Sequence, residues 1–407
     1  MYTETATPIE LKRYSMAALL KAFVATAVVR KGAVAVWRLP NTEGFHAVIN
    51  LSGQWATRKI EIESTSPGFV ISPFVNPTGE DTIYIPADLY YHSDTGRLEN
   101  ISGGNEEHKR QYLESVIRAL EHGPGKKVPY HTGRNPIFNG ADQKQYYLTI
   151  VEKGLRAIER GTFQKVVTAR TKQEELAPDF DLVETFLALA ETYPAGFASL
   201  FSVPGCGTWM GVSPELLIQI NREQVFRTVS LAGTQPISDN VDIAQAAWTQ
   251  KEIEEQAMVS RFIINQFKKI RLREFEEFGP RTVAAGNLMH LKTDFTVDLN
   301  NVNFPELGSI MLFLLHPTSA VCGMPKRRAI DFILKHETFD RAFYSGYLGP
   351  VNIQDETYIY VNLRCMQLFA DKTVLYAGSG ITHDSDPEKE WEETNLKCRT
   401  LLNVLRR

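Results

Sequence analysis

Two glutamates and a lysine near the C-terminus have a spacing that suits chemistry. Glu390, Glu393 and Lys397 stand at positions i, i+3 and i+7 of a predicted helix that follows the Gly-Ser-Gly sequence at 378–380. Side chains at these positions lie on one helix face. A glycine turn lets backbone N–H groups approach an anion, because no Cβ blocks them. The stretch predicts a site where an anion, a divalent cation and an ammonium group meet. A solvated helix face is the alternative.

Lys165 and Glu215 are charged residues in otherwise apolar predicted strands. Lys165 begins the run KVVTAR, and Glu215 lies between Pro214 and two leucines. Burial or a nearby cation favours the neutral amine of a lysine, which can then act as a base. Burial also favours a protonated carboxyl, which can act as an acid near neutral pH. The two residues therefore predict an acid and a base, and positions on the open face of a sheet are the alternative.

A second acidic cluster lies in a long predicted helix at 242–277, where Glu252 and Glu255 are one turn apart. Taken alone, the cluster is typical of a solvated helix face. Together with Glu393 it predicts a Mg²⁺ site, because Mg²⁺ binds one or two carboxylates, keeps several waters and leaves room for a substrate oxygen. The sequence has no clustered His and Cys ligands, which argues against zinc.

Two further residues are candidates for ligand binding. Arg364 falls in a predicted strand, on the same face as Tyr358, Tyr360 and Asn362. An arginine there can bind a carboxylate with two hydrogen bonds, and a surface position on the sheet is the alternative. His316, in the sequence LHPTSA, is by itself more typical of a structural histidine than of a catalytic one.

Composition narrows the class of protein. The 407 residues are 43% hydrophobic and 23% charged, with a net charge of −4, so no basic excess indicates binding to nucleic acid or anionic membranes. The four cysteines are far apart, as expected for reduced thiols. No secretory signal pattern is visible, and no apolar run approaches the ~20 residues of a membrane-spanning helix. We expect a cytoplasmic protein and, without coiled-coil heptads, a monomer.

Hydrophobic patterning predicts an α+β fold. Many of the predicted strands are adjacent in sequence, which favours antiparallel sheets, and helices fall between groups of strands without regular alternation. Residues 93–110 and 122–142 are polar and predict surface loops. The predicted helices lie at 15–29, 142–160, 181–193, 242–277, about 305–315 and after Pro325. The main predicted strands lie at 33–39, 46–51, 68–74, 82–92, 163–170, 196–203, 207–220, 225–236 and 289–299, and in a final group from 346 to 377.

Taken together, the motifs resemble the chorismate-utilising enzymes, a family that includes isochorismate synthases, salicylate synthases and the component I subunits of anthranilate and aminodeoxychorismate synthases. The resemblance covers about 160–405, and the first 140 residues resemble the family only weakly. The motifs that carry it are KVVTAR (165–170), FSVPGCGTWMGVSPELLI (201–218), LAGTQP (231–236), KEIEEQ (251–256), LHPTSAVCGMP (315–325), FDRAFYSGYLGPV (339–351), NLRC (362–365), GSGI (378–381) and DPEKEWEETNLK (386–397).

This resemblance implies one large α+β unit of antiparallel sheets flanked by helices, as in anthranilate synthase component I. Residues 1–140 would then be a β-rich section integrated into the same fold, and residues 141–407 would be the chorismate-binding catalytic region. It also implies chorismate as the substrate and Mg²⁺ as the cofactor.

The resemblance also implies a role for each matching residue. Lys165 matches the lysine that activates water for attack at C2, and Glu215 matches the acid that protonates the departing C4 hydroxyl. Glu255 and Glu393 match the metal ligands. The remaining matches are Glu252 and Glu390 as supporting acidic positions, Arg364, Gly378 and Lys397 as groups that hold substrate carboxylates, Gly233 and Thr234 beside them, and His316, Ala320, Val321 and Tyr344 around the ring.

Two features indicate the reaction. Within the family, a lysine at position 165 accompanies water as the nucleophile, and the ammonia-using relatives extend the long-helix motif with a DLxRND-type sequence where this chain reads MVSRFIINQ. Gln256 stands where relatives commonly have histidine. We expect an isochorismate synthase. Salicylate synthase, component I of anthranilate or aminodeoxychorismate synthase, and a non-catalytic relative are the alternatives. The sequence leaves open whether the product enters menaquinone or siderophore biosynthesis.

Overall fold

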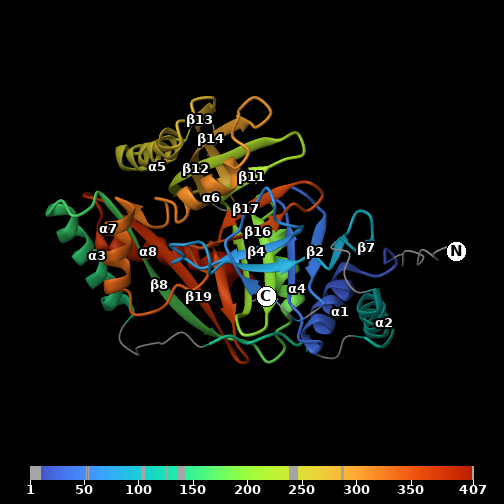
Figure 1. Ribbon diagram of the computed structural model, residues 1–407. Helices are drawn as coiled ribbons and strands as arrows, with labels where there is room; N and C mark the ends of the chain where they lie inside the picture. The colour runs from blue at the N-terminus through green and yellow to red at the C-terminus, as the bar shows by residue number, and fades with distance from the viewer. Residues whose placement is uncertain are drawn as a thin grey trace.

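The protein consists of two large antiparallel sheets packed face to face, with helices on their outer faces (Figure 1). The computed structural model describes residues 11–405, except 52, 54, 102–105, 124–126, 135–142, 238–245 and 286–287. The strand pairs are antiparallel, which confirms the predicted α+β class. Strands that precede residue 100 lie in both sheets.

The first sheet has ten strands, and its central strands are buried on both faces. In spatial order these are β15 (Gly323–Met324), β8 (Lys165–Glu175), β19 (Lys372–Ile381), β18 (Cys365–Leu368), β10 (Gly207–Ser213), β9 (Phe197–Val203), β1 (Val34–Arg38), β2 (Phe45–Ile49), β6 (Leu89–His92) and β7 (Arg97–Glu99).

The second sheet has nine strands. In spatial order these are β13 (Glu276–Ala285), β14 (Leu288–Asp298), β12 (Val225–Pro236), β11 (Leu216–Ile220), β17 (Thr357–Val361), β16 (Tyr347–Val351), β4 (Gly68–Ser72), β5 (Ile83–Pro86) and β3 (Ala56–Thr57).

Apolar cores fill the spaces between the layers. Trp37 of the first sheet packs with Phe69 of the second, and Phe197 stacks on Tyr360 with ring centroids 4.2 Å apart. Helices α1, α2, α4 and α8 cover the outer face of the first sheet, α5 and α6 cover that of the second, and α3 and α7 pack beside β8. The helices are α1 (Met16–Val29), α2 (Glu106–His122), α3 (Gln143–Glu159), α4 (Leu182–Thr192), α5 (Gln250–Lys269), α6 (Leu307–Leu315), α7 (Lys326–His336) and α8 (Pro387–Leu405).

Two of the places where the chain crosses between the sheets lie side by side. One crossing joins β10 to β11 and contains Glu215, and the other joins β17 to β18 and contains Arg364. Backbone hydrogen bonds connect them, because Val212 N donates to the carbonyl of Arg364 at 3.1 Å and Val361 N donates to that of Glu215 at 3.0 Å. An acidic and a basic side chain thereby reach one place from opposite ends of the sequence.

These crossings correct two expectations. The predicted strand at 207–220 is two strands in different sheets, because the ladder is interrupted at Pro214, which has no N–H to donate. Arg364 does not continue the strand that carries Tyr358 and Tyr360. It follows β17 with a φ of 47°, in the left-handed region.

Three other predictions were wrong in part. The Gly-Ser-Gly sequence at 378–380 forms no turn, because it pairs with residues 167–169 of β8 inside β19. Of the helix predicted over 242–277, residues 242–245 lie outside the described residues, and the described remainder is helical only in α5. Residues 276 and 277 belong to β13, which pairs with β14, so sheet pairing overrides helix propensity there. The loop predicted at 93–110 contains β7 and the start of α2.

Two further expectations were a surface loop at 122–142 and the lack of a membrane-spanning helix. Within the loop predicted at 122–142, residues 128–134 form neither helix nor strand, and 124–126 and 135–142 lie outside the described residues. Across the described part of the chain, no helix combines the length and apolar character needed to span a bilayer.

Candidate active site

A single cavity brings most of the predicted site residues together. It lies where β8 and β19 meet the two sheet crossings, with α5 and α8 on its other sides. The cavity is lined by Val167, Pro214, Glu215, Leu231, Ala232, Gly233, Thr249, Lys251, Glu252, Glu255, His290, Ala320, Val321, Tyr344, Leu363, Arg364, Tyr376, Ala377, Gly378, Gly380, Glu393 and Lys397.

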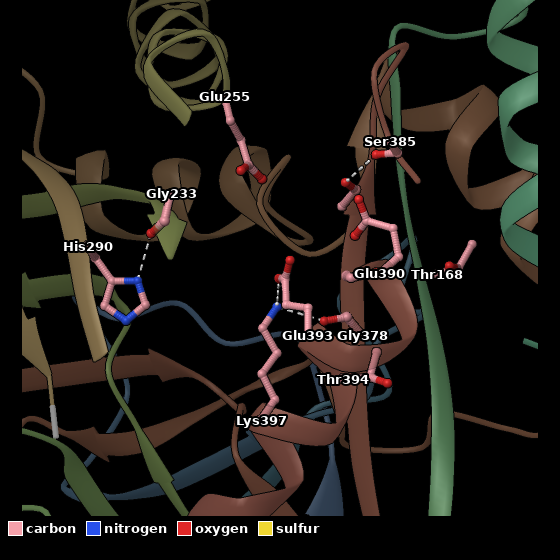
Figure 2. Close-up of polar contacts among 12 residues, drawn as sticks. Thr168, Gly233, Glu255, His290, Gly378, Ser385, Glu390, Glu393, Thr394 and Lys397 are labelled. Atoms are coloured by element: carbon pink, nitrogen blue, oxygen red, sulfur yellow. Dashed lines mark hydrogen bonds and ion pairs between the residues drawn. The ribbon is translucent and has the colours of Figure 1, made fainter. Parts of the chain in front are cut away.

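Helix α8 supplies one charged wall. Pro387 occupies its first position, where a missing N–H is tolerated, and Asp386 accepts a hydrogen bond from Lys389 N at 3.0 Å. Glu393 pairs with Lys397 at 2.7 Å, and the same ammonium donates to the carbonyl of Gly378 at 2.7 Å. Figure 2 shows this pair facing Glu255, which extends from α5 on the opposite side of the cavity.

The predicted supporting carboxylates are both engaged by α5. Glu390 is only 1% exposed and accepts a hydrogen bond from Lys251 at 3.0 Å. Glu252 accepts hydrogen bonds from the backbone N and hydroxyl of Thr249 at 2.8 and 2.9 Å, so it forms a capping box at the start of α5. Glu252 therefore fixes the end of the helix that carries Glu255.

Lys165 and Glu255 form a buried ion pair. The Lys165 side chain is 0% exposed, and its Nζ lies 2.6 Å from Glu255 Oε1. Burial by itself would raise the pKa of the Glu255 carboxyl, but the charges of Lys165, Lys397 and Lys251 hold that pKa below its usual value. Glu255 is therefore a carboxylate at neutral pH.

Glu215 has the opposite environment. Its side chain is almost fully buried beside Pro214 and receives one hydrogen bond, from the Thr318 hydroxyl at 3.2 Å. Burial raises the pKa of Glu215 to about 7, although Thr318, Lys165 and Lys397 lower it in part. A carboxyl with this pKa keeps a proton near neutral pH and can deliver it to a leaving group.

The two glycines at the end of β19 make room for the cavity. A Cβ at Gly378 would lie 2.6 Å from Thr168 O and 3.0 Å from the Tyr344 hydroxyl. A Cβ at Gly380 would lie 2.9 Å from Lys165 Cε and 3.0 Å from Glu255 Oε1. Glycine is needed here because charged side chains and neighbouring backbone approach the strand closely, and a turn is not involved.

Arg364 and Tyr344 face the cavity from the first sheet's side. Burial lowers the pKa of the Arg364 guanidinium below its usual value, yet a guanidinium stays charged at neutral pH. Burial raises the pKa of Tyr344 to about 12, so its phenol is neutral and can donate a hydrogen bond. Tyr344 stacks on Tyr376 with centroids 5.6 Å apart, which fixes its ring beside Gly378.

Three of the predicted site residues are not part of the cavity lining: Lys165, Glu390 and His316. Lys165 and Glu390 are buried but contact lining residues, Glu255 and Lys251 respectively. His316 is turned elsewhere: its Nε2 lies 3.0 Å from the carbonyl oxygen of Pro73, and its ring packs edge-on against Tyr347. Burial lowers the pKa of His316 to about 3, as expected of a neutral structural histidine. Thr234 belongs to β12, but its side chain lies outside the described residues.

Sequence analysis missed His290 and Lys251. His290 Nδ1 lies 2.9 Å from the carbonyl oxygen of Gly233, which follows a register shift in β12 (Figure 2). Burial lowers the pKa of His290 to about 4, so the ring is neutral. Alternation along the strand at 289–299 places His290 on the face opposite Phe295, but nothing in the sequence aligns that face with α5.

Gln256, which stands where relatives commonly have histidine, donates to Thr293 Oγ1 at 2.9 Å and thereby holds α5 against β14.

The acidic residues suit a magnesium ion better than a transition metal. Glu255 and Glu393 offer carboxylate oxygens to the same cavity, and among the described residues Oε2 of the buried Glu390 has no hydrogen-bond partner. No group of three His, Cys, Asp or Glu side chains in the described ranges is arranged to hold a metal by itself. Mg²⁺ needs no such group, because it retains waters and binds substrate oxygens.

Comparison with known proteins defines the class. A family model for chorismate binding enzymes matches residues 96–406, and the chain belongs to this family. The isochorismate synthase DhbC of Bacillus subtilis is 30% identical over 271 residues, which cover 64% of this chain and 67% of that protein. The isochorismate synthase MenF of Escherichia coli is 29% identical over 270 residues, covering 64% of this chain and 61% of that protein.

The fold agrees with this assignment. The solved structure of MenF, described as the menaquinone-specific isochorismate synthase from Escherichia coli, superposes with a TM-score of 0.74 at 21% identity, covering 98% of this chain and 93% of that one. The predicted chorismate-binding fold is therefore confirmed.

Proposed function

We propose that this protein is an isochorismate synthase, an isomerase that converts chorismate to isochorismate with Mg²⁺. The observation that carries the proposal is an acid and a lysine beside one cavity. Glu215, whose pKa is raised to about 7, lines the cavity, and Lys165 of β8 contacts the lining residue Glu255 of α5 at 2.6 Å. The relatives at about 30% identity are named isochorismate synthases, which supports the same reaction.

The reaction exchanges one hydroxyl for another on the ring. Lys165 is paired with Glu255 in this structure, and to act as the base it must first give up that pairing and a proton. As the free amine it then removes a proton from water while the water oxygen bonds to C2. The ring double bond shifts, and the C4–oxygen bond breaks as Glu215 donates its proton, so that the leaving group departs as water. Lys165 ends as an ammonium group and Glu215 as a carboxylate. One proton passing from lysine to glutamate through solvent restores both.

Cationic residues position the substrate, which has two carboxylates. Arg364 and Lys397 line the cavity and provide a guanidinium and an ammonium for them. Glu255 and Glu393 are the residues that would hold Mg²⁺, which when bound supplies positive charge against a substrate carboxylate. Much of the rate enhancement then comes from holding the ring between acid and base.

Product analysis by NMR tests this proposal. Purified protein is incubated with chorismate and Mg²⁺ without ammonia, and a second sample contains EDTA. We expect a mixture of chorismate and isochorismate that EDTA abolishes. Salicylate with pyruvate would instead indicate a salicylate synthase. An aminated product formed only with ammonia would indicate a component I enzyme, and no product under any condition would indicate a non-catalytic relative.

The compartment and oligomeric state follow as part of the proposal. We place the protein in the cytoplasm, and the four cysteines, none of which forms a disulfide, are consistent with a reducing environment. A monomer would suffice for catalysis, since one chain supplies both the acid and the lysine. Sedimentation at micromolar concentration checks the monomer.

A further inference from the structure

A second concave site lies on the surface between α3 and α7, which appear side by side in Figure 1. The helices are joined at both ends of the groove. The Tyr146 hydroxyl, near the start of α3, donates to the carbonyl of His336 at 2.7 Å, and Arg328, near the start of α7, donates to the carbonyl of Thr162 at 3.1 Å. The two helices therefore run antiparallel, and their facing side chains form a defined groove.

The groove is strongly basic although the chain has a net charge of −4. Lysine and arginine side chains lie on both of its sides, and the acidic lining is a single aspartate, Asp331. Arg156 pairs with Glu152 at 3.7 Å, whereas Lys153, Arg160, Arg328 and Lys335 form no ion pair with any described residue. The five basic lining residues are Lys153, Arg156, Arg160, Arg328 and Lys335.

The spacing of these cations suits an extended anion. Lys153 and Arg156 lie at i and i+3 of α3, and Arg160 directly follows the end of this helix. Arg328 and Lys335 lie at i and i+7 of α7. Seven residues of helix extend about 10 Å. Each side of the groove therefore presents a row of positive charge about 10 Å long, and the antiparallel arrangement sets Arg160 near Arg328 and Lys153 near Lys335.

The electrostatic effect of the cluster is visible at His336. This histidine lines the groove and packs against Phe332, with ring centroids 4.4 Å apart and the ring planes tilted by 49°. Burial lowers the pKa of His336, and the positive charges of Lys153 and Lys335 lower it further. Lys153 of α3 and Lys335 of α7 therefore both place positive charge at His336, and an anion bound between them would offset this charge.

We propose that the groove between α3 and α7 is a binding site for a small anion that carries at least two phosphate groups. Three of the five cations are arginines, whose planar guanidinium groups bind phosphate oxygens in pairs. The groove is concave, and a concave site binds a small compact ligand more readily than it binds the flat surface of a partner protein. The half-buried rings of Phe332 and His336 offer a surface on which a base could stack if the diphosphate belongs to a nucleotide.

The groove is separate from the cavity but connected to it through the backbone. Strand β15, which directly precedes α7, pairs with β8 at Val166 and Lys165. Helices α3 and α7 both pack against β8, the strand that carries Lys165. A ligand that draws these two helices together would therefore act on the position of Lys165. The proposal itself concerns binding and does not depend on the reaction that the cavity performs.

Calorimetric titration with pyrophosphate tests the proposal. The protein is kept in EDTA and low salt, so that no Mg²⁺ can bridge the ligand to the carboxylates of the cavity. The variant Arg160→Gln/Lys335→Gln removes one charge from each side of the groove. The matched control Arg261→Gln/Lys268→Gln removes two exposed charges from α5, outside the groove. Circular dichroism confirms that the variants fold.

We expect the wild type and the control to bind pyrophosphate equally and the double variant to bind at least about 10-fold more weakly, because each charge-assisted hydrogen bond to phosphate contributes more than a neutral one. Binding should weaken as salt rises. Titration with ADP separates a nucleotide from an inorganic ligand by its tighter binding.

Three results would overturn the proposal. The first is no binding of pyrophosphate or ADP. The second is equal affinity in the double variant, particularly if chorismate displaces the ligand and so places it in the cavity. The third is groove-dependent binding of polyglutamate without binding of pyrophosphate, which would indicate an acidic protein partner instead.

Discussion

The cavity has two walls that treat the same type of side chain in opposite ways. On the wall formed by the sheet crossings, Glu215 is buried with one hydroxyl as its partner, and its pKa rises to about 7. On the wall formed by α5, Glu255 is paired with Lys165 at 2.6 Å, and its pKa falls. Glu215 therefore keeps a proton and can act as a general acid, whereas Glu255 keeps its negative charge and can bind a cation. Environment assigns the roles, since the residue type is the same.

Replacing the base should have the largest effect on activity. Lys165→Ala should reduce kcat by about 10³-fold or more, because removal of a positioned proton acceptor costs 10²–10⁴-fold. Chorismate binding in the presence of Mg²⁺ should persist, since Arg364 and Lys397 remain. NMR of the product mixture and calorimetry with chorismate measure the two effects. A near-normal kcat would show that Lys165 is not the base.

Breaking the ion pair on the helix wall should have the largest effect on stability. Glu255→Gln leaves the fully buried ammonium of Lys165 without its anionic partner and should lower the free energy of unfolding by about 3 kcal/mol. Denaturant titration in EDTA measures this without a contribution from metal. An unchanged midpoint would mean that the pair is not formed in solution.

The pH dependence of stability in Glu215→Gln tests whether the pKa of Glu215 is raised, unlike that of Glu255. The pKa of Glu215 is raised in the folded state, so its contribution to stability is fully present below about pH 4.5 and is lost as pH rises towards 7. Glutamine does not titrate. As the pH rises from about 4.5 to about 7, the free energy of unfolding of the wild type should therefore fall by about 3 kcal/mol relative to that of the variant.

Glu255→Gln is the matched comparison and should show the opposite trend. Because the folded pKa of Glu255 is lowered, its contribution is present above the unfolded value and disappears as pH falls. Parallel curves for the two variants would refute the difference between the walls. For the wild type, kcat should also decline above about pH 7 as Glu215 loses its proton.

The smallest effect is expected at the start of α5. Glu252→Ala removes the capping box with Thr249 and should destabilise the protein by about 1 kcal/mol. The Mg²⁺ concentration for half-maximal activity should change little, since Glu255 and Glu393 remain. Thermal unfolding and a Mg²⁺ titration of activity measure both quantities. A loss of Mg²⁺ response as large as that of Glu255→Gln would instead make Glu252 a ligand.

Prediction succeeded where a local pattern carried the information. Strand alternation and adjacency indicated the α+β class, and helix spacing placed Glu390, Glu393 and Lys397 on one face of α8. Prediction failed where sheet pairing decided the conformation. Residues 276 and 277 fall in the helix predicted over 242–277, yet they begin β13, which pairs with β14.

The chemical groups of the site can be read from the residue types: a lysine and a glutamate in apolar strands, and two helices with carboxylates on one face. The task of each group depends on how distant segments pack together. Lys165 and Glu255 are 90 residues apart in sequence and meet because β8 and α5 border one cavity. His316 is directed to Pro73, and His290 lines the cavity in its place. The physical reason is that protonation and pairing depend on burial and on distances between distant segments, which no local pattern encodes.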